Sequence, residues 1–220
     1  MGNQPSGFDQ DVMNAICQDI KEAKSMGIEI CIVVGGGNIC RGAALSKLGI
    51  ERASADYMGM LATVMNALAM QSKLESVGLI TRVQSAISMV TVCEPYIRRK
   101  AIRHMEKGRV VIFAAGLGKP YVTTDTGAAL NAIEMRCDVL MKATQVDGIY
   151  TSDPKKDKAA VKFDRIDYKT ALTDDKINIM DSAAISLASE NGMPIIVFDI
   201  HKKGELKRVL QGKGAFTIVE

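Results

Sequence analysis

The sequence predicts an α/β protein with a mainly parallel central sheet and helices on both faces of that sheet. Short, β-branched apolar runs alternate with segments whose apolar residues recur at helical spacing, almost throughout the 220 residues. This strand-helix-strand order favours parallel strands joined by right-handed crossovers. Because 220 residues suffice for one large core, we expect a single domain over residues 1–220.

The first elements are a helix and a strand. Residues 9–26 carry apolar residues at helical spacing and acidic residues in the first turn, and Gly27 supplies a C-terminal stop. Residues 28–34 form a short apolar run that ends in three glycines, which is typical of a buried parallel strand.

A long helix is expected over residues 57–77, where two uncharged stripes are visible. The first stripe consists of residues 58, 61, 65 and 68 and predicts the apolar face of the helix. The second consists of Met60, Thr63, Ala67 and Met70. The second face is compatible with a subunit contact, although an interior core helix explains the pattern at least as well.

The remaining elements continue the alternation. Further strands are expected over 79–83, 109–115, 138–143, 193–200 and 215–219. Further helices are expected over 95–107, 125–136, 181–191 and 202–211. In parallel sheets of this kind, ligands bind at the carboxyl ends of the strands.

Composition excludes several classes of protein. No apolar run approaches the roughly 20 residues that cross a bilayer, so no membrane association is expected. The net charge of +3, with basic and acidic residues interleaved, gives little support to nucleic-acid binding. Five well-spread cysteines without a C-x-x-C pair favour neither a disulfide framework nor a zinc site, and they indicate a reducing cytoplasmic location.

Two glycine-rich turns follow predicted strands. In the first, Gly35-Gly36-Gly37-Asn38 offers bare backbone N–H groups for an anion, and Arg41 can bind phosphate oxygens; the alternative is a tight turn that needs positive φ. The second runs from Ala114 to Asp125, where Thr124 or Asp125 is placed to cap a helix whose first N–H groups attract phosphate. An ordinary N-cap explains that second pattern slightly better.

A third segment, residues 142–154, follows another predicted strand. Lys142 ends what is predicted to be a buried strand, where a lysine is costly without an anionic partner. Asp147-Gly148 between apolar residues predicts a hairpin turn.

Familiar catalytic signatures are absent from the sequence. It contains neither a G-x-x-x-x-G-K-[ST] P-loop nor the His-Arg-Asp and Asp-Phe-Gly motifs of protein kinases. Its two histidines, His104 and His201, lie in charged helical segments, which disfavours histidine-based catalysis or metal ligation.

Four ordered segments together resemble the bacterial UMP kinases of the amino-acid-kinase family. They are Gly35-Gly36-Gly37-Asn38-x-x-Arg41-Gly42, Asp56-x-Met58-Gly59-Met60-Leu61-Ala62-Thr63-Val64-Met65-Asn66, Thr123-Thr124-Asp125 and Lys142-Ala143-Thr144-x-Val146-Asp147-Gly148. The second segment is the most specific, because the others have counterparts throughout the amino-acid-kinase family. The resemblance implies the amino-acid-kinase fold and phosphoryl transfer from ATP to UMP.

The resemblance also implies roles for individual residues. UMP would contact Gly36, Arg41, Asp56, Leu117, Gly118, Lys119, Pro120, Tyr121, Val122, Thr123 and Thr124. ATP would contact Gly37, Arg41, Thr144, Tyr150 and Asp153. The catalytic residues would be Lys142, which neutralises the transferred phosphoryl group, Asp125, which orients lysines, and Arg41.

The expected chemistry needs no strong general base, because the UMP phosphate that attacks is already anionic. Positioning and electrostatic stabilisation would supply most of the acceleration. Mg²⁺ would arrive with ATP, without a metal site made by the protein. The resemblance further implies a homo-oligomer, a hexamer assembled from dimers, with GTP and UTP as effectors.

The sequence departs from the family at two places. Leu117 and Lys119 stand where relatives commonly carry Thr and Asn that hydrogen-bond to uracil, so backbone groups of the loop would have to read the base. Family members also begin with a strand ending in Lys-x-Ser-Gly-Glu, and no such strand precedes Ser6. We therefore expect the 220-residue chain to retain uridine-nucleotide binding but to turn over UMP poorly.

Two alternatives to a UMP kinase stay open on the sequence. One is a non-catalytic protein that binds or senses uridine nucleotides. The other is a different phosphotransferase of the same fold, which the segment from Asp56 to Asn66 disfavours.

Overall fold

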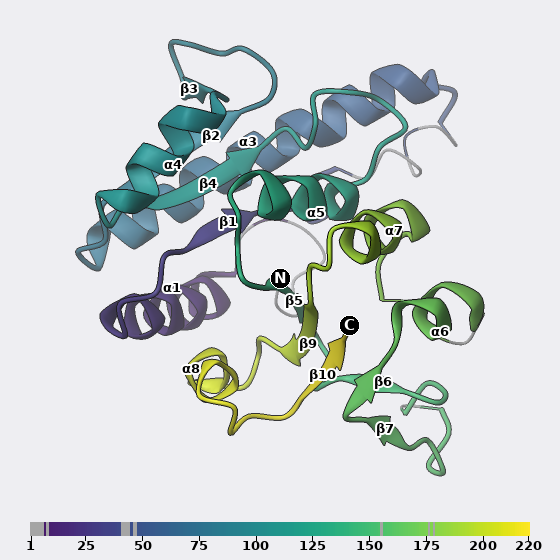
Figure 1. The fold of residues 1–220 in the computed structure, drawn as a ribbon. Helices are drawn as coiled ribbons and strands as arrows, with labels where there is room; N and C mark the ends of the chain where they lie inside the picture. Colours follow the sequence, from purple (N-terminus) through teal and green to yellow (C-terminus); the bar gives the residue numbers. More distant parts are fainter. Residues whose placement is uncertain are drawn as a thin grey trace. The chain divides into compact units, whose positions relative to one another are not determined.

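The computed structural model describes residues 7, 9–40, 45, 48–154, 156–175, 177 and 179–220 (Figure 1). The chain divides into two compact units, one ending at Gly127 and the other spanning Ala128–Glu220. Each unit is described by itself below. The organisation of residues 1–220 as a single domain stays a prediction.

The first unit is built on a four-stranded parallel sheet with the order β1-β4-β2-β3. Its strands are β1 (Cys31–Val33), β2 (Thr81–Ser85), β3 (Glu94–Pro95) and β4 (Val110–Ala114). β4 is central and buried along its whole length, as its continuous apolar sequence requires. The predicted strands at 28–34, 79–83 and 109–115 are confirmed, while the two-residue β3 was not predicted.

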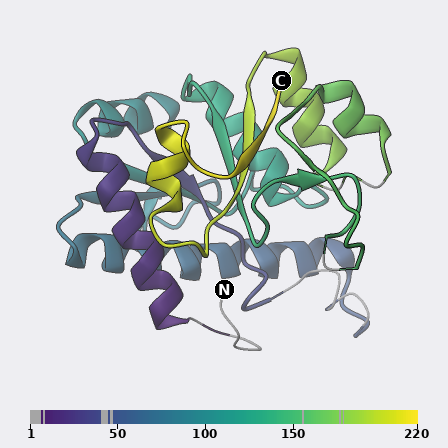
Figure 2. The ribbon, with the colours of Figure 1, turned by 90° about the horizontal axis from the view of Figure 1, so that it is seen from below.

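The helices of this unit are α1 (Gln10–Ser25), α3 (Arg52–Ser76) and α4 (Arg98–Glu106). Asp9 caps α1 by accepting the backbone N–H groups of Asp11 and Val12, and Gly27 has the left-handed φ of +83° that ends the helix as predicted. α3 packs on β2 and β4, α4 packs on β4, and α1 contacts α3. In Figure 2 the purple α1 crosses the long blue α3.

The two faces of α3 are the reverse of the sequence expectation. Met60, Thr63, Ala67 and Met70 form the buried face. Met58, Leu61 and Met65 are exposed, Met65 by 53%. Both stripes are uncharged, so composition could not rank them, and packing on β2, β4 and α1 decides which one is buried. The core-helix explanation of the second stripe is therefore confirmed, and that stripe is not available for a subunit contact.

The second unit contains a four-stranded sheet with the order β5-β9-β10-β8 and a two-stranded antiparallel pair, β6 and β7. Its strands are β5 (Leu140–Thr144), β6 (Ile149–Tyr150), β7 (Lys162–Phe163), β8 (Arg165–Ile166), β9 (Ile195–Asp199) and β10 (Phe216–Val219). Only β9 and β10 pair antiparallel in the larger sheet.

Among the described residues, the helices that accompany these strands are α5 (Thr124–Glu134), which continues from the first unit, α6 (Tyr168–Thr173), α7 (Ser182–Glu190) and α8 (Glu205–Leu210). The core joins alanines of α5 and α7 to Ile195 and Val197 of β9 and Val219 of β10. α6 and α7 lie on the opposite side of β9 and β10 from α8 (Figures 1 and 2). Mainly parallel sheets flanked by helices confirm the predicted fold class.

Two expectations about residues 140–150 are wrong. Lys142 lies in the middle of β5 and is only half-buried, because β5 is an edge strand of its sheet in the described chain. Asp147-Gly148 does not form a hairpin turn, since β5 pairs with β9 and β6 pairs with β7. Gly148 instead allows a close approach, because a Cβ there would lie 2.5 Å from Oγ1 of Thr217.

Candidate functional site

The first glycine turn is pressed against helix α3. A Cβ on Gly36 would lie 2.6 Å from the Gly59 carbonyl oxygen and 2.9 Å from the Ala62 Cβ, so only glycine fits at this position. Neither Gly35 nor Gly36 has positive φ. The alternative of a turn that needs positive φ is therefore wrong at these two residues, and close approach to α3 is the reason for Gly36.

Two asparagines hold this turn in place. The Asn66 amide nitrogen donates to the Gly35 carbonyl at 2.6 Å and to Oδ1 of Asn38 at 2.6 Å. The Asn38 amide in turn donates to Oδ1 of Asn66 at 3.1 Å and to the Gly7 carbonyl at 3.0 Å. Since Asn66 is buried, these bonds form away from competing water and fix the turn relative to α3.

The same helix also holds the second glycine turn. The buried hydroxyl of Thr63 donates to the Met60 carbonyl at 2.7 Å and accepts the backbone N–H of Ala115 at 2.7 Å. Thr63 and Asn66 are three positions apart and therefore lie on one face of α3. Their segment had been recognised as the most specific of the sequence, but no role had been predicted for either side chain.

The second turn carries an irregular, largely exposed loop. Ala115, Gly116, Gly118 and Tyr121 all have left-handed φ values. The Gly118 N–H donates to the Ala115 carbonyl at 2.8 Å, which closes the turn. Lys119, Tyr121, Val122 and Thr123 are exposed, while Leu117, Gly118 and Pro120 are half-buried. The loop predicted to contact uridine is thus accessible in the first unit.

Helix α5 begins directly after this loop, and its cap differs from the prediction. Oγ1 of Thr123 accepts the Thr126 N–H at 3.1 Å, so the helix is capped by Thr123 and not by Thr124 or Asp125. Thr124 and Asp125 are the first residues of the helix and are half-buried. The ordinary N-cap is therefore present at Thr123, and phosphate binding by the first N–H groups of α5 stays a prediction.

Asp56 joins α3 to the loop. Its Oδ2 accepts the Tyr121 N–H at 2.9 Å, and both of its oxygens lie 2.9 Å from Nε of Arg52. Asp56 is therefore beside the loop that follows the second turn. The first unit brings together Gly36, Asp56 and the residues from Leu117 to Thr124 around the N-terminal half of α3. Arg41 lies outside the described residues, and its role stays a prediction.

The second unit contains Thr144, Tyr150 and Asp153 of the residues expected to contact ATP, while Gly37 is exposed in the first glycine turn of the first unit. Oγ1 of Thr144 donates to the Val146 carbonyl at 2.7 Å and accepts the Val146 N–H at 3.0 Å, which closes the turn at the end of β5. Asp153 forms an exposed ion pair with Lys156 at 3.8 Å. Lys142 lies two residues before Thr144 on β5. These residues form one stretch of chain at the carboxyl end of β5.

Tyr150 is held by a charged pair that was not predicted. Its phenol donates to Oδ1 of Asp147 at 2.7 Å, and Nζ of Lys202 lies 3.1 Å from Oδ2. The hydrogen bond from Tyr150, followed by the contact with Lys202, keeps the pKa of Asp147 below its usual value despite partial burial. The same bond raises the pKa of Tyr150 to about 12, because ionisation would place two anions side by side.

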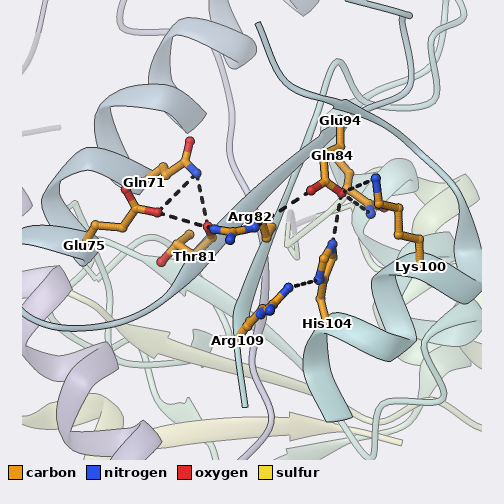
Figure 3. A network of polar contacts seen from close by, with 9 residues as sticks. All are labelled: Gln71, Glu75, Thr81, Arg82, Gln84, Glu94, Lys100, His104 and Arg109. Carbon is orange, nitrogen blue, oxygen red and sulfur yellow. Dashed lines mark hydrogen bonds and ion pairs between the residues drawn. The ribbon is translucent and has the colours of Figure 1, made fainter. Parts of the chain in front are cut away.

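A separate polar network in the first unit involves none of the predicted site residues (Figure 3). Glu94 accepts from Gln84 at 3.3 Å, Lys100 at 3.0 Å and Nε2 of His104 at 3.0 Å. Arg109 lies 3.0 Å from Nδ1 of His104. Since arginine only donates, Nδ1 must accept, and the neutral Nε2–H tautomer of His104 is assigned. His104 is buried and bridges Glu94 and Arg109.

The pKa of Glu94 follows from this network. Partial burial raises it, but the hydrogen bonds from His104, Lys100 and Gln84 together outweigh burial and leave the pKa below its usual value. Glu94 thereby links strands β2 and β3 to helix α4.

Neither a metal cluster nor a membrane span is found in the described part of the chain. Within it, no group of three or more His, Cys, Asp or Glu side chains is arranged to hold a metal ion. No helix there is long and apolar enough to cross a membrane.

Comparison with known proteins gives consistent results. Residues 4–199 match the profile of the amino acid kinase family. The chain is 55% identical over 219 residues to a uridylate kinase of Paramagnetospirillum magneticum, covering 100% of this chain and 91% of the relative. It is 57% identical over 218 residues to a uridylate kinase of Anaplasma phagocytophilum, covering 99% of this chain and 88% of the relative.

Solved structures agree with these relatives. The fold matches that of UMP kinase from Bacillus anthracis with a TM-score of 0.94 and 36% identity, over 100% of this chain and 90% of that one. UMP kinase from Ureaplasma parvum matches with a TM-score of 0.94 and 35% identity, over 100% and 93%. The chain therefore belongs to the amino acid kinase family, and to the uridylate kinase group within it.

Proposed function

We propose that the protein transfers the γ-phosphoryl group of ATP to UMP, giving UDP and ADP. This proposal rests on one observation: a single face of helix α3 holds both glycine-rich turns. Thr63 holds the second turn and Asn66 the first, and both belong to the segment that distinguishes UMP kinases from their family relatives. The names of the relatives, uridylate kinase and UMP kinase, support the same activity.

For the UMP side, Gly36, Arg41 and Thr124 bind the phosphate of UMP in this proposal. The role of Gly36 is supported by the close contact of its backbone with α3, which fixes the first glycine turn. The role of Thr124 is supported by its position as the first residue of α5, where backbone N–H groups attract phosphate. Asp56 accepts from the ribose, and the residues from Leu117 to Thr124 surround the uracil. The backbone of this loop offers N–H and C=O groups that can read the base in place of the Thr and Asn side chains that relatives commonly carry at Leu117 and Lys119.

For the ATP side, Gly37 and Arg41 contact the phosphates, while Thr144, Tyr150 and Asp153 surround the adenosine. An oxygen of the UMP phosphate attacks the γ-phosphorus, the bond to the β,γ-bridging oxygen breaks, and ADP leaves with that electron pair. In this proposal Lys142 neutralises negative charge on the transferred phosphoryl group, and Asp125 orients lysine side chains such as that of Lys142. Removing one such electrostatic donor lowers the rate about a hundredfold or more.

The divalent metal of this reaction is proposed to be Mg²⁺ carried on the ATP phosphates. The described residues offer no cluster of three or more metal ligands, so no protein-held metal is part of the proposal. Mg²⁺ supplies charge neutralisation on the phosphates when bound there.

The further proposals concern assembly and location. We propose a cytoplasmic homo-oligomer, a hexamer, with GTP and UTP as effectors. The exposed apolar side chains of α3, Tyr57, Met58, Leu61 and Met65, support a contact between copies on the face opposite to the one predicted. Light scattering measures the assembly state, and a monomer at micromolar concentration would contradict it.

The activity is tested by titrating the chain with UMP and by measuring ADP release from ATP with a panel of acceptors. Binding is measured beside turnover, so that recognition of UMP and phosphoryl transfer are scored separately. Binding of UMP together with UMP-dependent ADP release is the expected result. Release with a carboxylate or carbamate acceptor instead of UMP would establish a different phosphotransferase, and binding without any release would favour a regulatory protein.

A further inference from the structure

Arg52, Asp56 and Tyr121 form a three-residue cluster between α3 and the loop after the second glycine turn. Nε of Arg52 lies 2.9 Å from both oxygens of Asp56, and the two residues are one helical turn apart. The Tyr121 N–H donates to Oδ2 of Asp56 at 2.9 Å. The guanidinium carbon of Arg52 lies 5.7 Å from the centre of the Tyr121 ring, within the range of a cation–π contact.

The loop needs this support at Tyr121. Its φ of +66° is unfavourable for a bulky residue with a Cβ. Tyr121 as a whole is 69% exposed, so packing in a core does not fix it. The bond from the Tyr121 N–H to Asp56 and the contact of its ring with Arg52 are the interactions described for this residue that cross to α3.

The acceptor sites of Asp56 are unevenly occupied. A carboxylate offers about four lone-pair sites, two on each oxygen. Arg52 lies between the two oxygens and Tyr121 uses Oδ2, so Oδ1 keeps the larger free capacity. A ribose hydroxyl can therefore donate to Oδ1 while Oδ2 continues to hold the loop. Oδ1 can bind the ribose while Oδ2 binds the Tyr121 N–H only if the Asp56 carboxylate keeps its orientation. Arg52 fixes that orientation through its contact with both oxygens.

We propose that Arg52 is a positioning residue for UMP, acting by orienting the Asp56 carboxylate and steadying the loop at Tyr121. The inference rests on the proposed function, because it assigns the ribose of UMP to Asp56. Arg52 itself touches no reacting atom in this proposal. Its effect is therefore on UMP affinity, and the use of ATP is left unchanged.

The test compares Arg52→Met and Arg52→Lys with a matched control, Arg103→Met. Arg103 is likewise an exposed helical arginine paired with a nearby carboxylate, Glu106, at 3.1 Å. From an i,i+4 ion pair and one exposed cation–π contact, Arg52→Met is expected to raise the Kd and KM for UMP about fivefold. Lysine keeps the positive charge but lacks the planar guanidinium that lies over the Tyr121 ring. Arg52→Lys is therefore expected to give a Kd for UMP between those of the unsubstituted chain and Arg52→Met.

Four results would contradict this role of Arg52. An unchanged Kd for UMP in Arg52→Met, with UMP binding intact in the unsubstituted chain, would overturn the role of Arg52 alone. A parallel rise in KM for ATP, or a similar loss in Arg103→Met, would also overturn it by indicating a general structural effect. If the unsubstituted chain neither binds nor phosphorylates UMP, the proposed function fails together with this inference.

Discussion

Replacing Thr63 by valine removes one hydroxyl that serves two parts of the first unit. Valine has the same shape, so the change isolates the hydrogen bonds from packing. The Met60 carbonyl lies inside α3, where the helix supplies another donor. The Ala115 N–H is fully buried and loses its partner at 2.7 Å, which costs about 1–3 kcal/mol. We therefore expect the second glycine turn to be destabilised by about 2 kcal/mol.

Hydrogen exchange at the Ala115 amide measures this loss directly. A local destabilisation of about 2 kcal/mol raises the population of the open turn by about thirtyfold, and exchange at this amide should accelerate accordingly. UMP affinity should fall as well, because the turn carries the loop from Leu117 to Thr124. Thr63→Ser keeps the hydroxyl and is the control. Equal protection of Ala115 in the valine and serine variants would refute the reasoning.

Three further predictions address other contacts. Gly36→Ala places a Cβ against the α3 backbone at 2.6 Å, and we expect destabilisation of about 1–3 kcal/mol and weaker UMP binding, measured by denaturant unfolding and titration calorimetry. Asp147→Asn removes the charge that holds Lys202 and Tyr150, so the pKa of Tyr150 should move from about 12 toward 10.0 in an absorbance titration, and the KM for ATP should rise. The pKa of Glu94 is lowered in the folded chain, so its carboxylate stabilises the fold at pH values above 4.5, the ordinary pKa of glutamate. This stabilisation is lost as the pH falls through the lower pKa of the folded state. Glu94→Gln should therefore reduce the change of the unfolding midpoint with pH in this acidic range.

Each of these has a matched comparison. Gly35→Ala adds a Cβ with nothing within 4 Å and should leave the unfolding midpoint unchanged, so equal damage from both alanine variants would contradict the role of close approach at Gly36. An unaltered Tyr150 titration in Asp147→Asn would argue against their hydrogen bond. Identical acid unfolding of Glu94→Gln and the unsubstituted chain would show that another carboxylate governs that pH range.

Most helices and longer strands could be predicted because their signals are local. For helix α1, the apolar spacing, the acidic first turn and the stop at Gly27 lie within one contiguous segment, and all three were predicted from the sequence. The fully apolar run of β4 likewise leaves little choice but a buried strand. The short strands β3, β6, β7 and β8 were missed, because two residues carry no periodic pattern and depend on their pairing partners.

The candidate site was predicted in part. The segment from Asp56 to Asn66 was recognised as specific, but recognition gave no reason for Thr63 or Asn66, whose partners lie 52 and 28 to 31 positions away. Arg52 and Lys202 gave no signal at all, because exposed arginines and lysines are common on surfaces. The pairing of Arg52 with Asp56, one helical turn away, and of Lys202 with Asp147, 55 positions away, is identified only in the structure.

By itself, the sequence determined the α/β class, the order of the main elements and the segments that carry the family resemblance, since all of these depend on periodicity, caps and motifs read along the chain. Only the tertiary structure decided which stripe of α3 is buried, that Lys142 lies on an edge strand, and that Thr63, Asn66 and Asp56 hold the two turns and their loop. The physical reason is that burial and hydrogen-bond partners of side chains depend on what packs against them, and two uncharged stripes or two surface arginines look alike until that packing is known.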